Sequence, residues 1–203
     1  MPTKLSLSSD YDLAKESAKS ILSADGLLVY PTDTLYGLGC NALSQKAVDK
    51  IYELKARDQG KPLSMVVADF PMLLEYCTVS ESQEKILHSL LPGPYTFILP
   101  LRRKLPVSPS LSAGIRVPEH RFMRQVAKEL GFPIVSTSAN ISGKKDSAEA
   151  DGVDAEVASA VDLIIDGGKC KYAQGSTIID LVSMKIVRKG AVRDGDKFEW
   201  AKE

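Results

Sequence analysis

Tyr30-Pro31-Thr32-Asp33-Thr34-Leu35-Tyr36-Gly37-Leu38-Gly39 is the stretch of this sequence that says most about the fold, and it directly follows the apolar run Leu27-Leu28-Val29. Residues 27–31 have the composition of a buried β-strand, and residues 35–42 form a second predicted extended segment. The hydroxyls and the carboxylate between them are not what a sheet core selects. The two glycines permit unusual backbone conformations or the close approach of a ligand. We therefore interpret this stretch as one wall of a binding site.

Helical and strand patterns alternate along the rest of the chain. Apolar residues recur at intervals of three and four in the predicted helices, which cover residues 10–23, 44–55, 80–91, 119–130 and 153–160. Short apolar runs predict further strands at residues 63–68, 95–101, 114–117, 133–137, 163–165, 176–181 and 185–188. The alternation indicates an α/β fold, and the short connection Val182-Ser183-Met184 indicates that the sheet is mixed. We expect a twisted mixed β-sheet flanked by helices, in a single domain that covers residues 1–203.

Length and composition limit the classes of function. The 203 residues suffice for one domain with a sizeable core, and 44% hydrophobic with 26% charged residues is typical of a globular protein. Lys plus Arg and Asp plus Glu both total 26, so no overall charge attracts nucleic acid or an acidic membrane. Any site for an anion must therefore be local.

Cysteine usage and hydropathy bear on the cellular compartment. Cys40, Cys77 and Cys170 lie far apart without a CxxC pair, which disfavours a disulfide framework and a structural zinc site. We expect three free, partly buried thiols. Without a membrane-length apolar run or a signal-like start, a reducing cytoplasm is the expected location.

A cationic segment, Lys55-Ala56-Arg57-Asp58-Gln59-Gly60-Lys61-Pro62-Leu63, follows the second predicted helix. Two residues rotate a helix by about 200°, so Lys55 and Arg57 can share one site only if the helix ends near Lys55. Lys61 precedes proline and is therefore expected to be extended. A solvated helix end is the simpler alternative for such charges, but here Pro62 and Leu63 lead straight into an apolar strand.

A hydroxyl-rich segment, Ser136-Thr137-Ser138-Ala139-Asn140-Ile141-Ser142-Gly143, follows another predicted strand. Ser136 and Ser138 share one side of an extended chain, and Asn140 and Gly143 then turn the backbone. Such a turn can present N–H groups to phosphate oxygens, although a plain serine-rich turn is an equal alternative. The segment lacks the Gly-Lys-Ser/Thr ending of a Walker A loop.

A lone arginine stands in the apolar segment Gly114-Ile115-Arg116-Val117-Pro118. A guanidinium stays charged in proteins and needs a partner when it is buried. A structural salt bridge and a bound carboxylate satisfy that need equally well. Both alternatives stay open from the residues alone.

Together with Gly175-Ser176-Thr177 and Arg188-Lys189-Gly190, these segments resemble the YrdC/TsaC family of threonylcarbamoyl-AMP synthases, over residues 24–193. The resemblance implies a YrdC-like fold with a concave ligand-binding surface. It also implies a reaction that joins L-threonine, bicarbonate or CO2 and ATP, with Mg²⁺ on the phosphates, and releases pyrophosphate. The adenylate then passes to a separate tRNA threonylcarbamoyl-transferase complex, which forms N6-threonylcarbamoyladenosine at tRNA position 37.

Such a reaction needs cations to stabilise the leaving pyrophosphate, and Arg57, Lys61 and Arg188 are the candidates, with Arg57 and Lys61 as the catalytic residues. No metal-binding side chains are expected. Residues implied to bind L-threonine are Thr34, Arg116, Ser136 and Ser176. Residues implied to bind the nucleotide are Arg57, Lys61, Ser112, Ser138, Asn140 and Arg188.

Two positions depart from the family's pattern. Asp146 stands where many members have serine, for which Ser147 could substitute by a shift of one residue, and Val66 stands where some members have histidine. Two other functions remain as alternatives. One is a tRNA- or double-stranded-RNA-binding module that makes no adenylate, and the other is a domain that uses carbamoyl phosphate, as in hydrogenase-maturation proteins.

Overall fold

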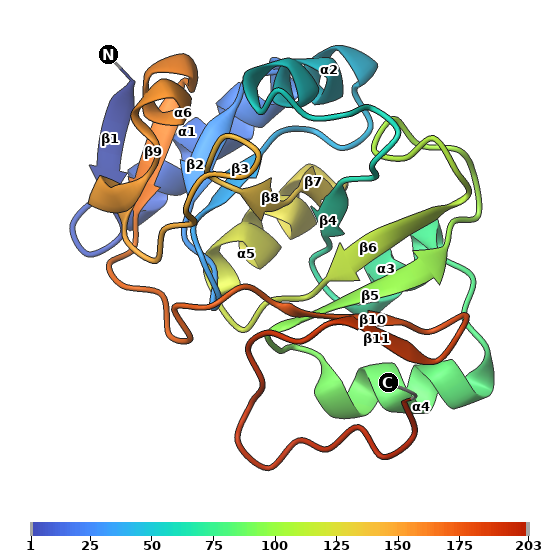
Figure 1. The fold of residues 1–203 in the computed structure, drawn as a ribbon. Helices are drawn as coiled ribbons and strands as arrows, with labels where there is room; N and C mark the ends of the chain where they lie inside the picture. The colour runs from blue at the N-terminus through green and yellow to red at the C-terminus, as the bar shows by residue number, and fades with distance from the viewer. Residues whose placement is uncertain (1, 202–203) are drawn as a thin grey trace.

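Strands in the computed structural model, which describes residues 2–201, form two mixed β-sheets with helices around them (Figure 1). The first sheet has five strands, in the order β1 (Thr3–Ser6), β9 (Leu163–Asp166), β2 (Leu28–Tyr30), β3 (Gly37–Gly39) and β8 (Thr137–Ser138). The second has six strands, in the order β11 (Lys185–Arg188), β10 (Thr177–Asp180), β5 (Tyr95–Pro100), β6 (Ser112–Arg116), β4 (Ser64–Val66) and β7 (Ile134–Val135).

Both sheets combine parallel and antiparallel pairs. In the first, β2 runs antiparallel to β3 and parallel to β9. In the second, β6 runs parallel to β4 and antiparallel to β5. The predicted α/β class and the mixed pairing are confirmed, and the strands divide between two sheets.

The division between the sheets occurs within one short segment of chain. Residues 133–137 were expected to form one strand, but Val135 pairs with Met65 of β4 whereas Thr137 pairs with Leu38 of β3. Ser136 lies at the crossing, and its backbone N–H donates to the Ser64 carbonyl at 2.8 Å. The hydroxyl-rich segment therefore stands where the two sheets meet.

The helices begin at side-chain caps that satisfy free backbone N–H groups. Ser44 accepts from the Ala47 N–H at the start of one helix, and Ser80 and Gln83 form the expected capping box at another. Gly131, in a left-handed conformation with φ of 73°, ends the helix that covers Arg121–Leu130. The helices are α1 (Tyr11–Ser23), α2 (Gln45–Leu54), α3 (Phe70–Tyr76), α4 (Glu81–Leu90), α5 (Arg121–Leu130) and α6 (Ala155–Ala160), with a 3₁₀ turn at Ala150–Gly152.

Two elements were missed by the pattern analysis. Strand β1 has exposed or half-buried residues throughout and pairs only with β9, so it carries no apolar alternation. Helix α3 has Pro71 in its first turn, where proline is tolerated. In a sequence pattern, however, proline usually indicates the end of a helix, so this helix was not predicted. Short elements that tertiary contacts hold in place leave a weak local signal.

Helix α1 packs on β1, β2, β9 and α5, while α4 lies along the β10–β11 end of the second sheet (Figure 1). No helix within residues 2–201 is both long and apolar enough to cross a bilayer. The cysteines Cys40, Cys77 and Cys170 are free thiols, as expected, and all are buried.

Gly37 and Gly39 have a structural explanation that differs from the expected one. Neither has a positive φ. A Cβ on Gly39 would lie 2.6 Å from Cε1 of Tyr30 and 2.7 Å from the Val135 carbonyl oxygen. A Cβ on Gly37 would lie 3.0 Å from the same Tyr30 ring. The glycines let β3 pack against the buried Tyr30.

Gly39→Ala is therefore expected to lower the free energy of unfolding by about 1–3 kcal/mol, the usual cost of overpacking a core. Gly60→Ala is a matched control, because its Cβ would meet only the exposed Asp58 side chain, at 3.2 Å. Urea denaturation of both variants measures the difference. Equal midpoints for the two variants would contradict this explanation.

Candidate functional site

Two adjoining cavities lie where the sheets meet. The first has a volume of about 190 Å³. Its polar lining residues come from both sheets and from the loops between them, and are Thr34, Arg57, Ser64, Thr96, Arg116, Ser136, Thr137, Ser138, Asp146, Ser176 and Arg188.

The second cavity, of about 530 Å³, opens beside the segment after α2. Its polar lining residues are Lys55, Arg57, Asp58, Lys61, Thr137, Ser138, Asn140, Ser142, Lys144 and Asp146. Arg57, Thr137, Ser138 and Asp146 line both cavities, so a ligand in one lies next to a ligand in the other.

The structure brings every predicted site residue except Ser112 to one of these cavities. Ser112 begins β6, and its Oγ lies 3.2 Å from Oγ of Ser110. Arg116 ends the same strand, and four residues of extended chain separate the two by about 13 Å. Within residues 2–201, Ser112 is therefore not part of the lining of either cavity.

Arg116 is buried in the wall of the first cavity, with 9% of its side chain exposed. Its Nη2 donates to Oδ1 of Asp33 at 3.1 Å and to Oγ1 of Thr34 at 2.7 Å. Its buried Nε has no hydrogen-bond partner in the described part of the chain. The structure thus shows the structural salt bridge, and the unpaired Nε keeps a bound carboxylate as a prediction.

The turn that carries Asp33 is held by hydroxyls. The Thr32 hydroxyl accepts from the backbone N–H groups of Thr34 and Leu35 and donates to the Leu35 carbonyl at 2.7 Å. The Thr34 hydroxyl lies 2.9 Å from that of Thr32 and accepts from Arg116. This hydrogen-bonded turn, typical of Ser and Thr, fixes the Thr34 side chain against the arginine.

Arg188, at the end of β11, reaches back to the start of β10. Its Nη2 donates to the Ser176 carbonyl at 2.8 Å and to Ser176 Oγ at 3.2 Å. Ser176 Oγ in turn lies 2.8 Å from the Thr96 hydroxyl. Burial lowers the pKa of Arg188 from its usual value, and the nearby Asp146 carboxylate partly opposes this. A bound anion beside Arg188 would stabilise the charged guanidinium in the same way as the Asp146 carboxylate does.

Lys55 is buried, and its ammonium meets three oxygens. Nζ donates to the Ser138 carbonyl at 2.5 Å, the Asn140 carbonyl at 2.6 Å and Asn140 Oδ1 at 3.0 Å. The Ser138 hydroxyl also donates to Asn140 Oδ1, at 2.7 Å. Burial lowers the pKa of Lys55 to about 8. Lys55 therefore ties the end of α2 to the hydroxyl-rich turn at the edge of the second cavity.

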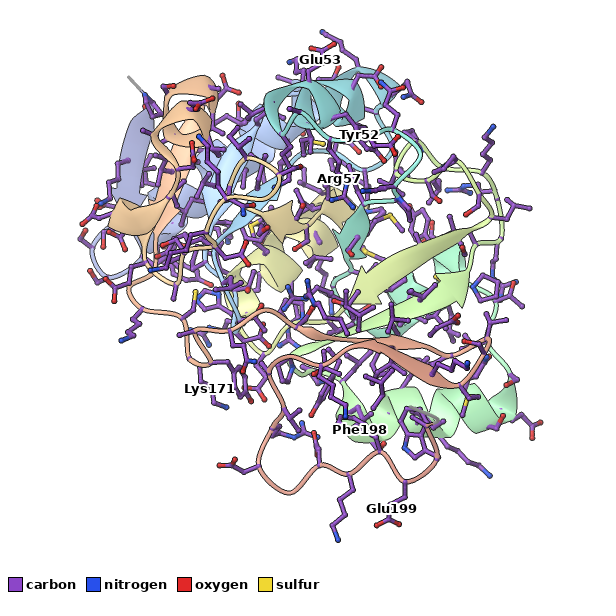
Figure 2. The ribbon with its side chains drawn as sticks, in the orientation of Figure 1. Tyr52, Glu53, Arg57, Lys171, Phe198 and Glu199 are labelled. Atoms are coloured by element: carbon purple, nitrogen blue, oxygen red, sulfur yellow. The ribbon has the colours of Figure 1, made fainter. Side chains whose placement is uncertain are left out.

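Arg57 and Lys61 stand on the loop after α2. The helix ends at Leu54, as the positions of Lys55 and Arg57 required, and Ala56 has a left-handed φ of 46°. The Arg57 guanidinium donates to the Pro62 carbonyl at 3.0 Å. The Tyr52 hydroxyl donates to the Lys61 carbonyl at 2.9 Å. Figure 2 shows Arg57 beyond the end of α2, facing the region of β4 and β8.

Asp146 lines both cavities, whereas Ser147 does not replace it. Ser147 is buried, with its Oγ donating to the Glu149 carbonyl at 2.6 Å and accepting from the Glu149 N–H at 3.1 Å. The expectation that Ser147 takes the place of the family's serine, by a shift of one residue, is therefore wrong, because the Ser147 hydroxyl is used within its own turn. Val66 is fully buried in β4 and pairs with Arg116 on β6.

Some lining residues were not predicted from the sequence, notably Lys144 among the cations and Thr96 and Ser64 among the hydroxyls. Thr96 lies in the apolar strand Tyr95–Pro100, where a single buried hydroxyl was the available signal. No group of three or more His, Cys, Asp and Glu side chains within residues 2–201 is placed to hold a metal ion. Arginines, lysines and hydroxyls around adjoining cavities are suited to bind two anionic ligands next to each other.

Comparisons with known proteins identify the family of this chain. The profile of the Sua5/YciO/YrdC family, described as "Telomere recombination", matches residues 20–190. A Methanocaldococcus jannaschii protein with the provisional name threonylcarbamoyl-AMP synthase is 40% identical in an alignment of length 196 that covers 91% of this chain and 90% of that protein.

Two solved structures superimpose closely on this fold. P. abyssi Sua5, in a crystal structure complexed with L-threonine, gives a TM-score of 0.83 at 30% identity over 94% of this chain and 57% of that chain. E. coli YciO gives a TM-score of 0.84 at 26% identity over 96% of this chain and 98% of that chain. This chain thus spans less than two thirds of the P. abyssi protein. The resemblance expected from the motifs is confirmed, and the chain belongs to the Sua5/YciO/YrdC family.

Proposed function

We propose that this protein is an L-threonylcarbamoyladenylate synthase, a nucleotidyltransferase that forms threonylcarbamoyl-AMP and pyrophosphate from L-threonine, bicarbonate or CO2 and ATP. The observation that carries the proposal is the pair of adjoining cavities that share Arg57 and Ser138. The first cavity, with Arg116 at its wall, suits a small amino acid. The second, with Lys61 and Asn140, suits a triphosphate.

The chemistry needs no nucleophile from the protein. The neutral amine of threonine attacks the carbon of CO2 or bicarbonate and gives a carbamate, with loss of a proton or of water. A carbamate oxygen then attacks the α-phosphorus of ATP, and the bond to pyrophosphate breaks. The protein has to align the reactants and stabilise the charge that grows on the leaving group. Arg57 and Lys61 line the second cavity, and Arg188 lines the first near Asp146, which borders both. We assign these three cations to this second task.

The shared wall explains the alignment. Arg57 and Ser138 face both ligands, so the amino group and the α-phosphate meet where the cavities join. The buried Lys55 fixes the Ser138–Asn140 turn through two hydrogen bonds to its backbone carbonyls and one to Asn140 Oδ1. A turn held in this way is preorganised, so it does not have to be ordered when ATP binds.

Mg²⁺ is proposed to accompany ATP and to be held mainly by phosphate oxygens and water, as Mg²⁺ commonly is in phosphoryl-transfer sites. The donor set fits this arrangement, because Asp146 supplies a single carboxylate at the junction of the cavities. A bound Mg²⁺ would neutralise phosphate charge and remove the repulsion between Asp146 and the nucleotide.

The product is proposed to serve N6-threonylcarbamoyladenosine formation at tRNA position 37, through a separate transferase complex in the cytoplasm. Net charge near zero gives the chain no general attraction to RNA. The basic loop after β5 adds little to the attraction for RNA, because its arginines already have partners. The Arg102 guanidinium donates to the carbonyls of Leu74 and Cys77, and Arg103 lies over the Tyr76 ring.

One assay tests the proposed function. The purified chain is incubated with labelled bicarbonate, ATP, Mg²⁺ and a panel of amino acids, and an amino-acid-carbamoyl adenylate is sought by mass spectrometry. Threonine-dependent label in an adenylate, together with pyrophosphate, is the expected result. Pyrophosphate release that is independent of any amino acid would contradict the proposal.

ATP affinity is expected to fall above about pH 8. The pKa of Lys55 is lowered to about 8, so the ammonium is present below that pH and loses its proton as the pH rises above it. A neutral amine can donate only two of the three hydrogen bonds to the turn, so the turn loosens. Calorimetric titration of ATP alone, between pH 6.5 and 9.5, measures the effect.

Lys104→Met is the control for this titration, since Lys104 lies outside both cavities. It should keep the decline of ATP affinity with pH, whereas Lys55→Met should bind ATP weakly at every pH with no further decline near pH 8. A decline that persists in Lys55→Met would show that another group titrates.

A further inference from the structure

We propose that Asp33 is a positioning residue for substrate recognition, because it orients the Arg116 guanidinium so that its remaining donors are available to the substrate carboxylate. The inference rests on the proposed function, in which Arg116 binds the carboxylate of an amino acid. Asp33 itself does not line the first cavity; it lies behind Arg116.

The Asp33 carboxylate joins three parts of the chain. Its Oδ1 accepts from Arg116 Nη2 at the end of β6, and its Oδ2 accepts from the Glu119 N–H at 2.9 Å, just before α5. Its own backbone belongs to the turn between β2 and β3, and its carbonyl accepts from the Tyr172 N–H at 2.9 Å. Only 1% of the Asp33 side chain is exposed, so these contacts take the place of water around its carboxylate.

These contacts determine which part of Arg116 remains available. Nη2 has two hydrogens, and Asp33 and Thr34 accept both. The buried Nε is left without a partner among residues 2–201. A buried donor of this kind is costly unless something pairs with it. A carboxylate in the first cavity would accept from the guanidinium and remove that cost.

The burial of Asp33 supports a dedicated function for this pair. Desolvation raises the pKa of Asp33, and the charge of Arg116 opposes the rise. A buried ion pair is often no more stabilising than an apolar pair of similar size, so stability alone does not explain it. Holding a guanidinium in one orientation does.

Asp33→Asn tests the inference, because asparagine keeps the size of the side chain but has one acceptor oxygen in place of two. Its NH2 group has to face a donor, either Arg116 Nη2 or the Glu119 N–H, and it brings no negative charge to Arg116. The guanidinium is therefore held less firmly in its orientation. Calorimetry is expected to show the Kd for L-threonine raised about tenfold or more and the Kd for ATP changed less than twofold.

Asp166→Asn is the matched control. Its carboxylate also accepts from a backbone N–H, that of Gly168 at 2.9 Å, and from a side chain, the Tyr36 hydroxyl at 3.3 Å, but it does not touch Arg116. It should leave both affinities unchanged. If Asp33→Asn does not fold, Asp33→Glu serves instead, because it keeps the charge and both oxygens but moves the carboxylate by one methylene.

The outcomes separate the inference from the proposed function. Unchanged threonine affinity in the Asp33 variant, or equal losses for threonine and ATP, would overturn the inference while the wild-type protein still binds threonine. A wild-type protein that binds ATP but no amino acid would overturn the proposed function and the inference with it.

Discussion

Arg116→Ala is expected to raise the Kd for L-threonine by about a hundredfold or more, while the Kd for ATP changes by only a fewfold. A carboxylate held by a guanidinium receives charge-assisted hydrogen bonds of about 1.5–3 kcal/mol each, and two such bonds correspond to at least two orders of magnitude. Arg116 lines the first cavity and not the second, so ATP has no reason to depend on it directly. Calorimetric titration with each ligand measures both constants.

The same substitution is expected to destabilise the fold. Arg116 and Asp33 are an almost fully buried ion pair, and removal of one partner leaves the other charge uncompensated, which costs about 3–5 kcal/mol. The titrations therefore have to be made well below the melting temperature of the variant. Arg116→Lys is the control, because it keeps a cation beside Asp33 but lacks the planar fork. Equal losses of affinity for both ligands would make Arg116 a purely structural residue.

Lys61→Ala is expected to reduce threonine-dependent pyrophosphate release by about tenfold to a hundredfold, the equivalent of one charge-assisted contact to the leaving group. Lys61 is exposed at the second cavity, so its ammonium can reach phosphate oxygens. Its backbone carbonyl, which accepts from Tyr52, survives the substitution, and the fold should be unaffected. A coupled pyrophosphate assay at saturating ATP and threonine measures the rate.

Lys46→Ala is a suitable comparison for this variant. Lys46 is exposed on α2, with 72% of its side chain accessible, and it lies in neither cavity. It should turn over at the wild-type rate with an unchanged melting temperature. If Lys61→Ala shows the same rate as Lys46→Ala, then Lys61 has no part in the reaction, and Arg57 and Arg188 alone would have to stabilise the leaving group.

Much of the fold was accessible to pattern analysis because long amphipathic helices and buried strands carry a local signal. Helix α2 ends at Leu54, as the opposed directions of Lys55 and Arg57 required, and the capping box at Ser80 was recognised from four residues. The division into two sheets was not accessible, because the pairing partners of Val135 and Thr137 lie about 70 and 100 residues away in the chain.

The site shows the same contrast. The hydroxyls of residues 30–39, and the hydroxyls and cations of the later segments, indicated residues of a binding site, because a sheet core does not select such side chains. Lys55 was grouped with its neighbouring cations by proximity, but only the fold shows that its ammonium is used internally, by the carbonyls of Ser138 and Asn140. Likewise, no local pattern shows that Gly39 accommodates the Tyr30 ring.

By itself the sequence determined the class of the fold, which follows from short-range composition and spacing. Its motifs also resembled those of a known family, and that resemblance implied most of the residues that surround the cavities. Tertiary structure decided which charges are free to meet a ligand and which are already paired. Arg116 illustrates the reason, because the acceptors on its Nη2 come from a turn more than 80 residues earlier in the chain. Pairing across such separations depends on how the sheets pack, and spacing along the chain contains no record of it.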